Sequence, residues 1–280
     1  MGIPVFAALL KPVELAARVD PLSGQVIPDP VSLGVSPSDE AALEWALRCA
    51  ERHGGSVRAL AAGEREPAEV ALRLAAAAGA AELAHVSLDP DWPSDWVGRS
   101  LAQEMTDVAL AWCGDMSLDR GSGSVPAFVA AELGWPQALG LVGVELPAGP
   151  GESFEVLRRL DGGRRERLLV TGPAVLSVEG ATARLRRAGF SALLAANREP
   201  APVKTVPGRV GRTARPAVGA VSPYRPPARV VPPPAGDTAG ERIRSLIGLE
   251  GRPVAHRSLH LAPAEAAAMI IESLESWGEL

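Results

Sequence analysis

Short apolar runs alternate with helical patterns through the first half of this chain, and this alternation limits the fold more than any other feature. The strand-like runs span residues 5–10, 57–63, 82–88 and 108–114, and the helical patterns between them span about 36–53, 67–79 and 94–105. Strands separated by helices predict βαβ units, in which parallel strands are connected by crossover helices. We therefore predict an α/β fold around a mostly parallel sheet.

The pattern changes after the first half. Residues 154–170 alternate apolar and polar side chains around Asp161-Gly162-Gly163, which predicts an antiparallel hairpin with a glycine-rich turn. Residues 173–178 form another apolar strand. From Pro200 to Gly236 the chain is rich in proline and contains no acidic residue, which favours a solvated, extended linker over a nucleic-acid or membrane patch. Helices are expected near 241–247 and 263–277, so we predict a domain at 1–198 and a linker with a helical arm at 199–280.

Composition narrows the function classes. The 280 residues carry a net charge of −5, which argues against a general nucleic-acid binder. Two cysteines give neither a metal site nor a disulfide framework, so a reduced, cytoplasmic compartment is expected. The amino-terminal apolar run is short and no basic region precedes it, so we do not expect a signal peptide. No apolar stretch is long enough to span a bilayer.

The most informative segment is the loop that follows the strand at 108–114, with the sequence CGDMSLDRGSGSV. Three glycines and three serines lie within this loop, and a helical pattern begins at Val125. A loop between a parallel strand and a helix lies where such sheets bind ligands, and its N–H groups can hold a phosphate without a lysine. The loop itself contains no lysine, which suits a permanently bound monophosphate. A plain glycine-rich turn remains the alternative.

Motifs for catalysis are missing from the sequence. There is no Gly-x-Ser-x-Gly elbow, and the lysine of a Walker sequence is absent. His85 lies in an apolar strand and is interpreted as a packed side chain, while His256 and His260 have no further ligand at a suitable spacing. We therefore predict no catalytic residue and no metal site.

Several segments together resemble the beta subunit of electron transfer flavoproteins, the FixA type, in order and spacing from about Val5 to Asn197. They are SPSDEAALEWAL, the glycine loop followed by Leu-Gly-Trp-Pro-Gln (133–137), and the Asp-Gly-Gly hairpin. Lys11, Asp20-Pro21 with Gly24, and the tail PAEAAAMIIESLESWGEL add to the resemblance. The arginine-rich and alanine-rich composition further suggests the subfamily encoded beside mycofactocin systems.

The resemblance implies a Rossmann-like, three-layer fold related to adenine-nucleotide hydrolases, with a C-terminal extended arm. It implies an electron carrier rather than an enzyme. In this family the beta subunit pairs with an alpha subunit that holds most of the FAD, and it binds AMP or a second FAD itself. Electrons would come from flavin or mycofactocin-linked dehydrogenases and pass to a downstream quinone-linked oxidoreductase.

The resemblance also implies site residues. Those outside the loop are Leu9 after the first strand, Ser36 before the first helix and Ala62 after the second strand. Those in the loop are Gly114, Asp119, Gly121, Ser122, Gly123, Ser124 and Val125. A dehydrogenase-docking segment is implied after Val178, with Phe190 as its anchor and Leu193 and Leu194 behind it.

The chain departs from the family pattern in places that bear on the ligand. Gly114-Asp115-Met116 stands where the family has Gly-Lys-Gln, and Leu15-Ala16 replaces an aromatic residue near the flavin. Two alternatives therefore stay open. One is an adenine-nucleotide hydrolase or ligase on the same fold, with Asp115 and Asp119 as its only candidate metal-binding carboxylates. The other is a nucleotide-free scaffold subunit. We also predict that the proline-rich segment wraps the partner.

Overall fold

The computed structural model describes residues 3–147, 153–198, 201–211, 233–234, 236–246 and 261–277. The chain divides into two compact units, Met1–Tyr224 and Arg225–Leu280. The first contains the sheet, and the second contains α6 (Ala239–Leu246) and α7 (Pro263–Trp277), which confirms the two C-terminal helices. Among the described residues no helix is long and apolar enough to cross a membrane. The predictions for His256, His260 and most of the proline-rich segment lie outside these ranges.

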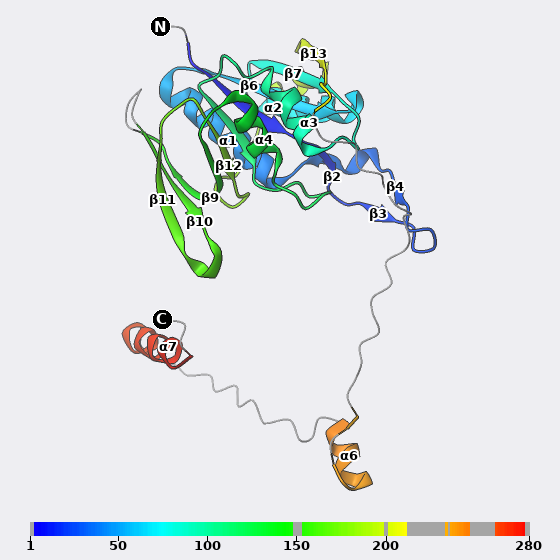
Figure 1. Cartoon of the computed structure of the whole chain (residues 1–280), viewed down its shortest axis with the longest axis vertical. Coiled ribbons are helices and arrows are strands. Elements are labelled where there is room, and N and C mark those ends of the chain that lie inside the picture. Colours follow the sequence, from blue (N-terminus) through cyan, green and yellow to red (C-terminus); the bar gives the residue numbers. More distant parts are fainter. Residues whose placement is uncertain are drawn as a thin grey trace. The chain divides into compact units, whose positions relative to one another are not determined.

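A nine-stranded sheet forms the centre of the first unit, in the order β11-β10-β9-β12-β8-β1-β6-β7-β13. The parallel strands are β1 (Val5–Leu10), β6 (Ser56–Gly63), β7 (Glu82–Ser87), β8 (Leu110–Gly114), β9 (Gln137–Glu145), β12 (Ala174–Val178) and β13 (Val203–Pro207). At one end, β10 (Phe154–Arg159) and β11 (Arg165–Val170) are antiparallel (Figure 1). The predicted α/β fold with a mostly parallel sheet is confirmed.

Helices cover both faces of the sheet in three layers. The helices are α1 (Pro37–His53), α2 (Arg65–Ala78), α3 (Ser94–Ala102), α4 (Val125–Leu133) and α5 (Phe190–Arg198). Side chains of α1 and α2 share one buried cluster with strand residues such as Phe6 and Trp112. Side chains of α3 and α4 share the second cluster with strand residues on the other face, among them Leu9 and Cys113. The Rossmann-like, three-layer expectation is therefore confirmed.

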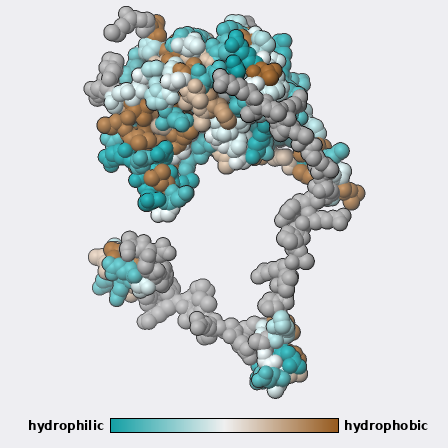
Figure 2. All heavy atoms as spheres, viewed as in Figure 1, coloured by the Kyte–Doolittle hydropathy of each residue, from teal (hydrophilic) through white to brown (hydrophobic). Residues whose placement is uncertain are grey.

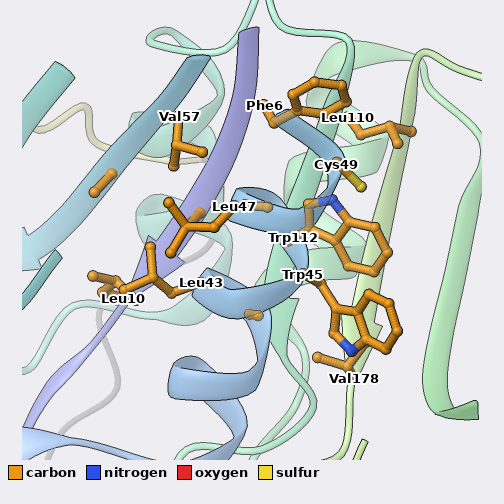
Figure 3. Packing of buried hydrophobic residues seen from close by; sticks show 14 of the residues in the cluster. Phe6, Leu10, Leu43, Trp45, Leu47, Cys49, Val57, Leu110, Trp112 and Val178 are labelled. Carbon is orange, nitrogen blue, oxygen red and sulfur yellow. The ribbon is translucent and has the colours of Figure 1, made fainter. Parts of the chain in front are cut away.

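Small side chains build most of the core, and two indoles fill its centre. Trp45 of α1 stacks on Trp112 of β8 with ring centroids 6.0 Å apart and an interplanar angle of 20° (Figure 3). Cys49 and Leu47 pack in the same cluster. Alanines on the strands let α1 approach the sheet closely enough for these rings to be buried.

Helix α1 begins and ends where its sequence requires. The Ser36 hydroxyl accepts a hydrogen bond from the N–H of Asp39 at 3.1 Å, so Ser36 caps the helix. Asp39 and Glu40 lie in the first turn, where the helix dipole favours negative charge. Gly54 ends the helix in the left-handed conformation, with φ of 64°. This cap brings Ser36 and Asp39 to the edge of the sheet at which β8 ends.

The two ends of the sheet are the β10–β11 hairpin, which was predicted, and a strand at residues 203–207, which was not. The β10–β11 hairpin is confirmed, and its turn at Asp161–Gly163 has φ of 69° at Gly162. The linker interpretation is wrong for residues 203–207, because Val203–Pro207 forms the edge strand β13 and pairs in parallel with β7. An edge strand tolerates proline because one side of its backbone needs no partner strand.

Short pairs of strands complete the first unit. Between β1 and α1, β2 (Pro12–Glu14) pairs with β5 (Leu33–Val35), and β3 (Arg18–Val19) pairs with β4 (Val26–Ile27). A 3₁₀ turn at Pro30–Ser32 precedes β5. Figure 1 shows this β3–β4 hairpin projecting away from the antiparallel end of the sheet.

Candidate functional site

A cavity of about 210 Å³ opens at the carboxyl ends of β1, β6, β7 and β8. This is the edge at which parallel sheets bind ligands. Of the predicted nucleotide-site residues, those that line the cavity are Leu9, Ala62, Gly114, Asp119, Ser122, Gly123 and Val125. The structure thus brings together residues from three strands and the glycine loop, which lie more than a hundred positions apart in the sequence.

The remaining predicted residues lie beside the cavity and shape it. Ser36 is buried and caps α1 through its hydroxyl. Gly121 turns the loop with φ of 61°, a conformation that favours glycine. Ser124 is the N-cap residue of α4 and makes no side-chain capping hydrogen bond. Their direct contact with a nucleotide remains a prediction.

The glycine loop is held in one conformation by its own backbone. The N–H of Ser117 donates to the Ser122 carbonyl at 3.0 Å, and the N–H of Gly121 donates to the Ser117 carbonyl at 2.8 Å. A Cβ atom on Gly123 would lie 2.0 Å from the Asp115 carbonyl oxygen, so only glycine fits there. The loop is therefore a preformed concave backbone rather than an open turn.

Lys11 brings a second cation to a loop that itself carries Arg120. It follows β1, and its Nζ donates to the Ser117 hydroxyl at 2.9 Å and to Asp119 Oδ2 at 2.7 Å. Ser117 and Asp119 lie 106 and 108 positions after Lys11 in the sequence, so Lys11 was not predicted as a residue of this site. A signal was present, because a lysine directly after a buried parallel strand must lie at the ligand-binding edge.

This arrangement can hold an anion. Val125 and Pro126, at the N-terminus of α4, line the cavity, and the helix dipole favours negative charge there. Lys11 and the Ser117 and Ser122 side chains stand nearby. Asp119 already pairs with Lys11, so the Lys11 ammonium is shared between this carboxylate and any bound phosphate. Among the described residues, no group of three or more metal-ligating side chains could hold an ion.

The three aspartates at the site differ in the direction of their pKa shifts. Burial raises the pKa of Asp39 to about 7, although the N–H of Lys11 donates to this carboxylate at 3.0 Å. Burial and the charge of Glu179 also raise the pKa of Asp115. For Asp119, burial acts in the same direction, but hydrogen bonds from Lys11 and Ser117 hold its pKa below the usual value. Asp119 is therefore a stable partner of Lys11 at neutral pH.

The raised pKa of Asp39 predicts a pH dependence of stability. The folded chain keeps a proton on Asp39 that the unfolded chain releases above its ordinary pKa of 3.8, so the free energy of unfolding falls as pH rises from about 4 to 7. The variant Asp39→Asn stays neutral at both pH values. The difference in free energy of unfolding between variant and wild type should therefore shift in favour of the variant when the pH is raised from 5 to 8. Urea denaturation at both pH values measures this, and an equal difference at pH 5 and pH 8 would contradict it.

Comparison with known proteins agrees with this geometry. A family model described as the electron transfer flavoprotein domain matches residues 26–207, about two thirds of the chain. The chain belongs to the electron transfer flavoprotein beta subunit family. The narrower assignment to a mycofactocin-associated subfamily remains a prediction.

Electron transfer flavoprotein beta subunits of three bacteria illustrate the similarity. The chain is 32% identical to the beta subunit of Thermoanaerobacterium thermosaccharolyticum, in an alignment that covers 52% of this chain and 56% of the relative. The chain thus spans little more than half the length of that relative. It is 26% identical to that of Syntrophomonas wolfei over 71% of the chain and 79% of the relative. It is 34% identical to that of Mycobacterium tuberculosis over 60% of the chain and 65% of the relative.

In this beta-family chain the predicted docking residues lie at the start of α5. Phe190 is 81% exposed and Leu193 is 42% exposed, so both are available on the surface. Leu194 is half-buried and so less available, and Ala196 on the same helix is buried. Phe190 and Leu193 are three positions apart, which places them on one face of the helix.

Proposed function

We propose that this chain is the beta subunit of a heterodimeric electron transfer flavoprotein, and that its glycine loop holds AMP as a structural ligand. The observation that carries the proposal is the cavity at the carboxyl ends of four parallel strands, lined by loop backbone, Lys11 and apolar side chains. The loop end suits a phosphate, because donor groups and the α4 dipole converge there. Leu9, Ala62 and Val125 suit the apolar faces of a nucleoside.

We assign FAD mainly to the alpha subunit, where it would supply the one-electron and two-electron chemistry. The beta subunit then orders the complex and presents a docking surface, without substrate-level catalysis of its own. Electrons would enter from a flavin or mycofactocin-linked dehydrogenase and leave to a quinone-linked oxidoreductase. A second FAD in the beta subunit would instead indicate an electron-bifurcating member of the family.

Exposed apolar surface supports the need for a partner subunit. In the β3–β4 hairpin, Val19, Leu22, Val26 and Ile27 are exposed, and Figure 2 shows brown side chains at this hairpin. On α7, Met269, Ile270 and Ile271 are exposed as well. Exposed apolar side chains gathered on one element are typical of interaction surfaces. Wrapping of the partner by the proline-rich segment belongs to the same proposal.

Co-expression with an alpha-type subunit tests the proposed function. A heterodimer should elute as one species with flavin absorbance, which dithionite bleaches and a soluble quinone restores. Separate elution of the two chains, or a heterodimer without flavin, would contradict the electron-carrier proposal.

Phe190→Ala is expected to slow flavin reduction in the complex roughly tenfold, because an exposed aromatic anchor is typical of a binding hot spot. Stopped-flow measurement with a purified dehydrogenase that reduces the wild-type complex gives the rate. Leu169→Ala is a matched control, since Leu169 is 74% exposed on β11, away from α5. Equal rates for Phe190→Ala and the wild type would remove Phe190 from the docking surface.

A further inference from the structure

The cavity has a second wall that the sequence analysis did not predict. Opposite the glycine loop, the segment after β7 contributes Leu88, Pro90 and Trp92 to the lining. Trp92 is half-buried, and its indole is the only aromatic ring among the side chains that line this cavity in the described part of the chain. An aromatic ring at the rim of an apolar cavity is a candidate contact for a planar ligand group.

Contacts from three directions fix Trp92 in place. The Arg120 guanidinium reaches across from the glycine loop and donates to the carbonyl oxygens of Trp92, at 3.0 Å, and of Pro90. The ring of Trp96 meets the Trp92 ring edge-on, with centroids 5.1 Å apart. A Cβ atom on Gly208 would lie 2.7 Å from Trp92 Cζ3, so the chain after β13 packs directly against the indole.

The strand order gives the cavity two ends that differ in chemistry. The glycine loop follows β8 and the Trp92 segment follows β7, with β1 and β6 between them. Three interstrand spacings separate the two ends, which amounts to about 14 Å. The β8 end holds Lys11 and the α4 N-terminus, whereas the lining at the β6 and β7 end includes the apolar side chains of Ala62, Pro67 and Leu88. A phosphate and an aromatic base on one molecule would match these two ends.

We infer that Trp92 forms the wall against which the nucleobase rests, and that Arg120 keeps this wall closed over the site. This inference rests on the proposed function and adds a base-specific contact to it. The ligand is then a nucleoside monophosphate recognised at both ends, rather than a phosphate recognised alone. In this inference the ring face of Trp92 contacts the nucleobase. Arg120 acts as a positioning residue, because its hydrogen bonds join the glycine loop to the Trp92 segment.

The test compares two ligands that share the phosphate and the sugar but differ in the base. AMP and ribose 5-phosphate are titrated calorimetrically into the nucleotide-depleted full complex, as wild type, Trp92→Ala and Trp92→Phe. Trp92→Ala should lose roughly tenfold in AMP affinity, the scale of base–aromatic stacking, and keep its affinity for ribose 5-phosphate. Trp92→Phe keeps a ring and should retain most of the AMP affinity. Leu169→Ala, which removes an exposed apolar side chain of β11 outside the cavity lining, serves as the control and should leave the affinity for both ligands unchanged.

Other outcomes separate this inference from the proposed function. Unchanged AMP affinity in Trp92→Ala would overturn the role of Trp92 while leaving the AMP site intact. An equal loss for both ligands would mean that Trp92 only supports the loop, and would also overturn the inference. A wild-type complex that binds neither ligand would overturn both the AMP site and the base wall.

Discussion

Replacing Lys11 by alanine is expected to weaken AMP binding by roughly ten- to a hundredfold. Hydrogen bonds to charged groups contribute about 1.5–3 kcal/mol each, which corresponds to this range of affinity. The loss has a second cause, because Asp119 would then face the phosphate without its cationic partner. Isothermal titration of the nucleotide-depleted complex with AMP measures the change.

The chain offers a matched control for this experiment, since Lys204 is its only other lysine. Lys204 lies on the edge strand β13 and donates to Glu104 at 2.6 Å, away from the cavity lining. Lys204→Ala should therefore leave AMP affinity unchanged. Equal affinities in Lys11→Ala and Lys204→Ala would contradict the assignment of Lys11 to the phosphate.

Arg186→Ala is expected to lower the free energy of unfolding by about 3 kcal/mol, as expected when one partner of a buried ion pair is removed. The Glu44 carboxylate is buried, and the Arg186 side chain donates to it at 2.9 and 3.1 Å while the Arg186 N–H donates at 3.1 Å. Burial alone would raise the pKa of Glu44, but Arg186 and Arg48 hold it below the usual value. Urea denaturation at neutral pH measures the loss.

The contact between Arg186 and Glu44 also holds the segment that precedes the predicted docking helix α5. Arg186 lies in the segment between β12 and α5, so Glu44 anchors the chain just before Phe190 to helix α1. Arg187→Ala, a change at an exposed neighbour, should alter the free energy of unfolding by less than about 0.5 kcal/mol. A similarly small effect for Arg186→Ala would show that the ion pair does not hold this segment.

Helices and strands were predicted correctly where the residues at their ends mark the boundaries. Helix α4 begins at Val125 as expected, because a glycine loop precedes it, and Gly134 terminates it after Leu133. Strand β9 was not recognised as a separate element. Gly140 and Gly143 interrupt its apolar pattern, and the register with β12 shifts near Gly140. Strand β13 was assigned to a linker because Pro202 before it and Pro207 at its end outweighed its short apolar pattern.

Leu9, Ala62 and loop residues were predicted for the candidate site and line the cavity, whereas Lys11 and Trp92 were not predicted. The loop residues could be named in advance because a glycine-rich loop between a strand and a helix is a local pattern, and because this loop resembles that of the family. Lys11 and Trp92 reach the cavity only because β1 and β7 end at the same edge of the sheet. Which residues after each strand meet there depends on the strand order, and a single sequence does not specify that order.

The most direct test of the central claim identifies the nucleotides released from the denatured heterodimer. Chromatography of the supernatant should give FAD and AMP in equal amounts for the wild-type complex. A Lys11→Ala complex should keep its FAD and lose AMP, since the phosphate then loses the Lys11 ammonium. FAD without AMP in the wild-type complex would contradict a nucleotide site in the glycine loop.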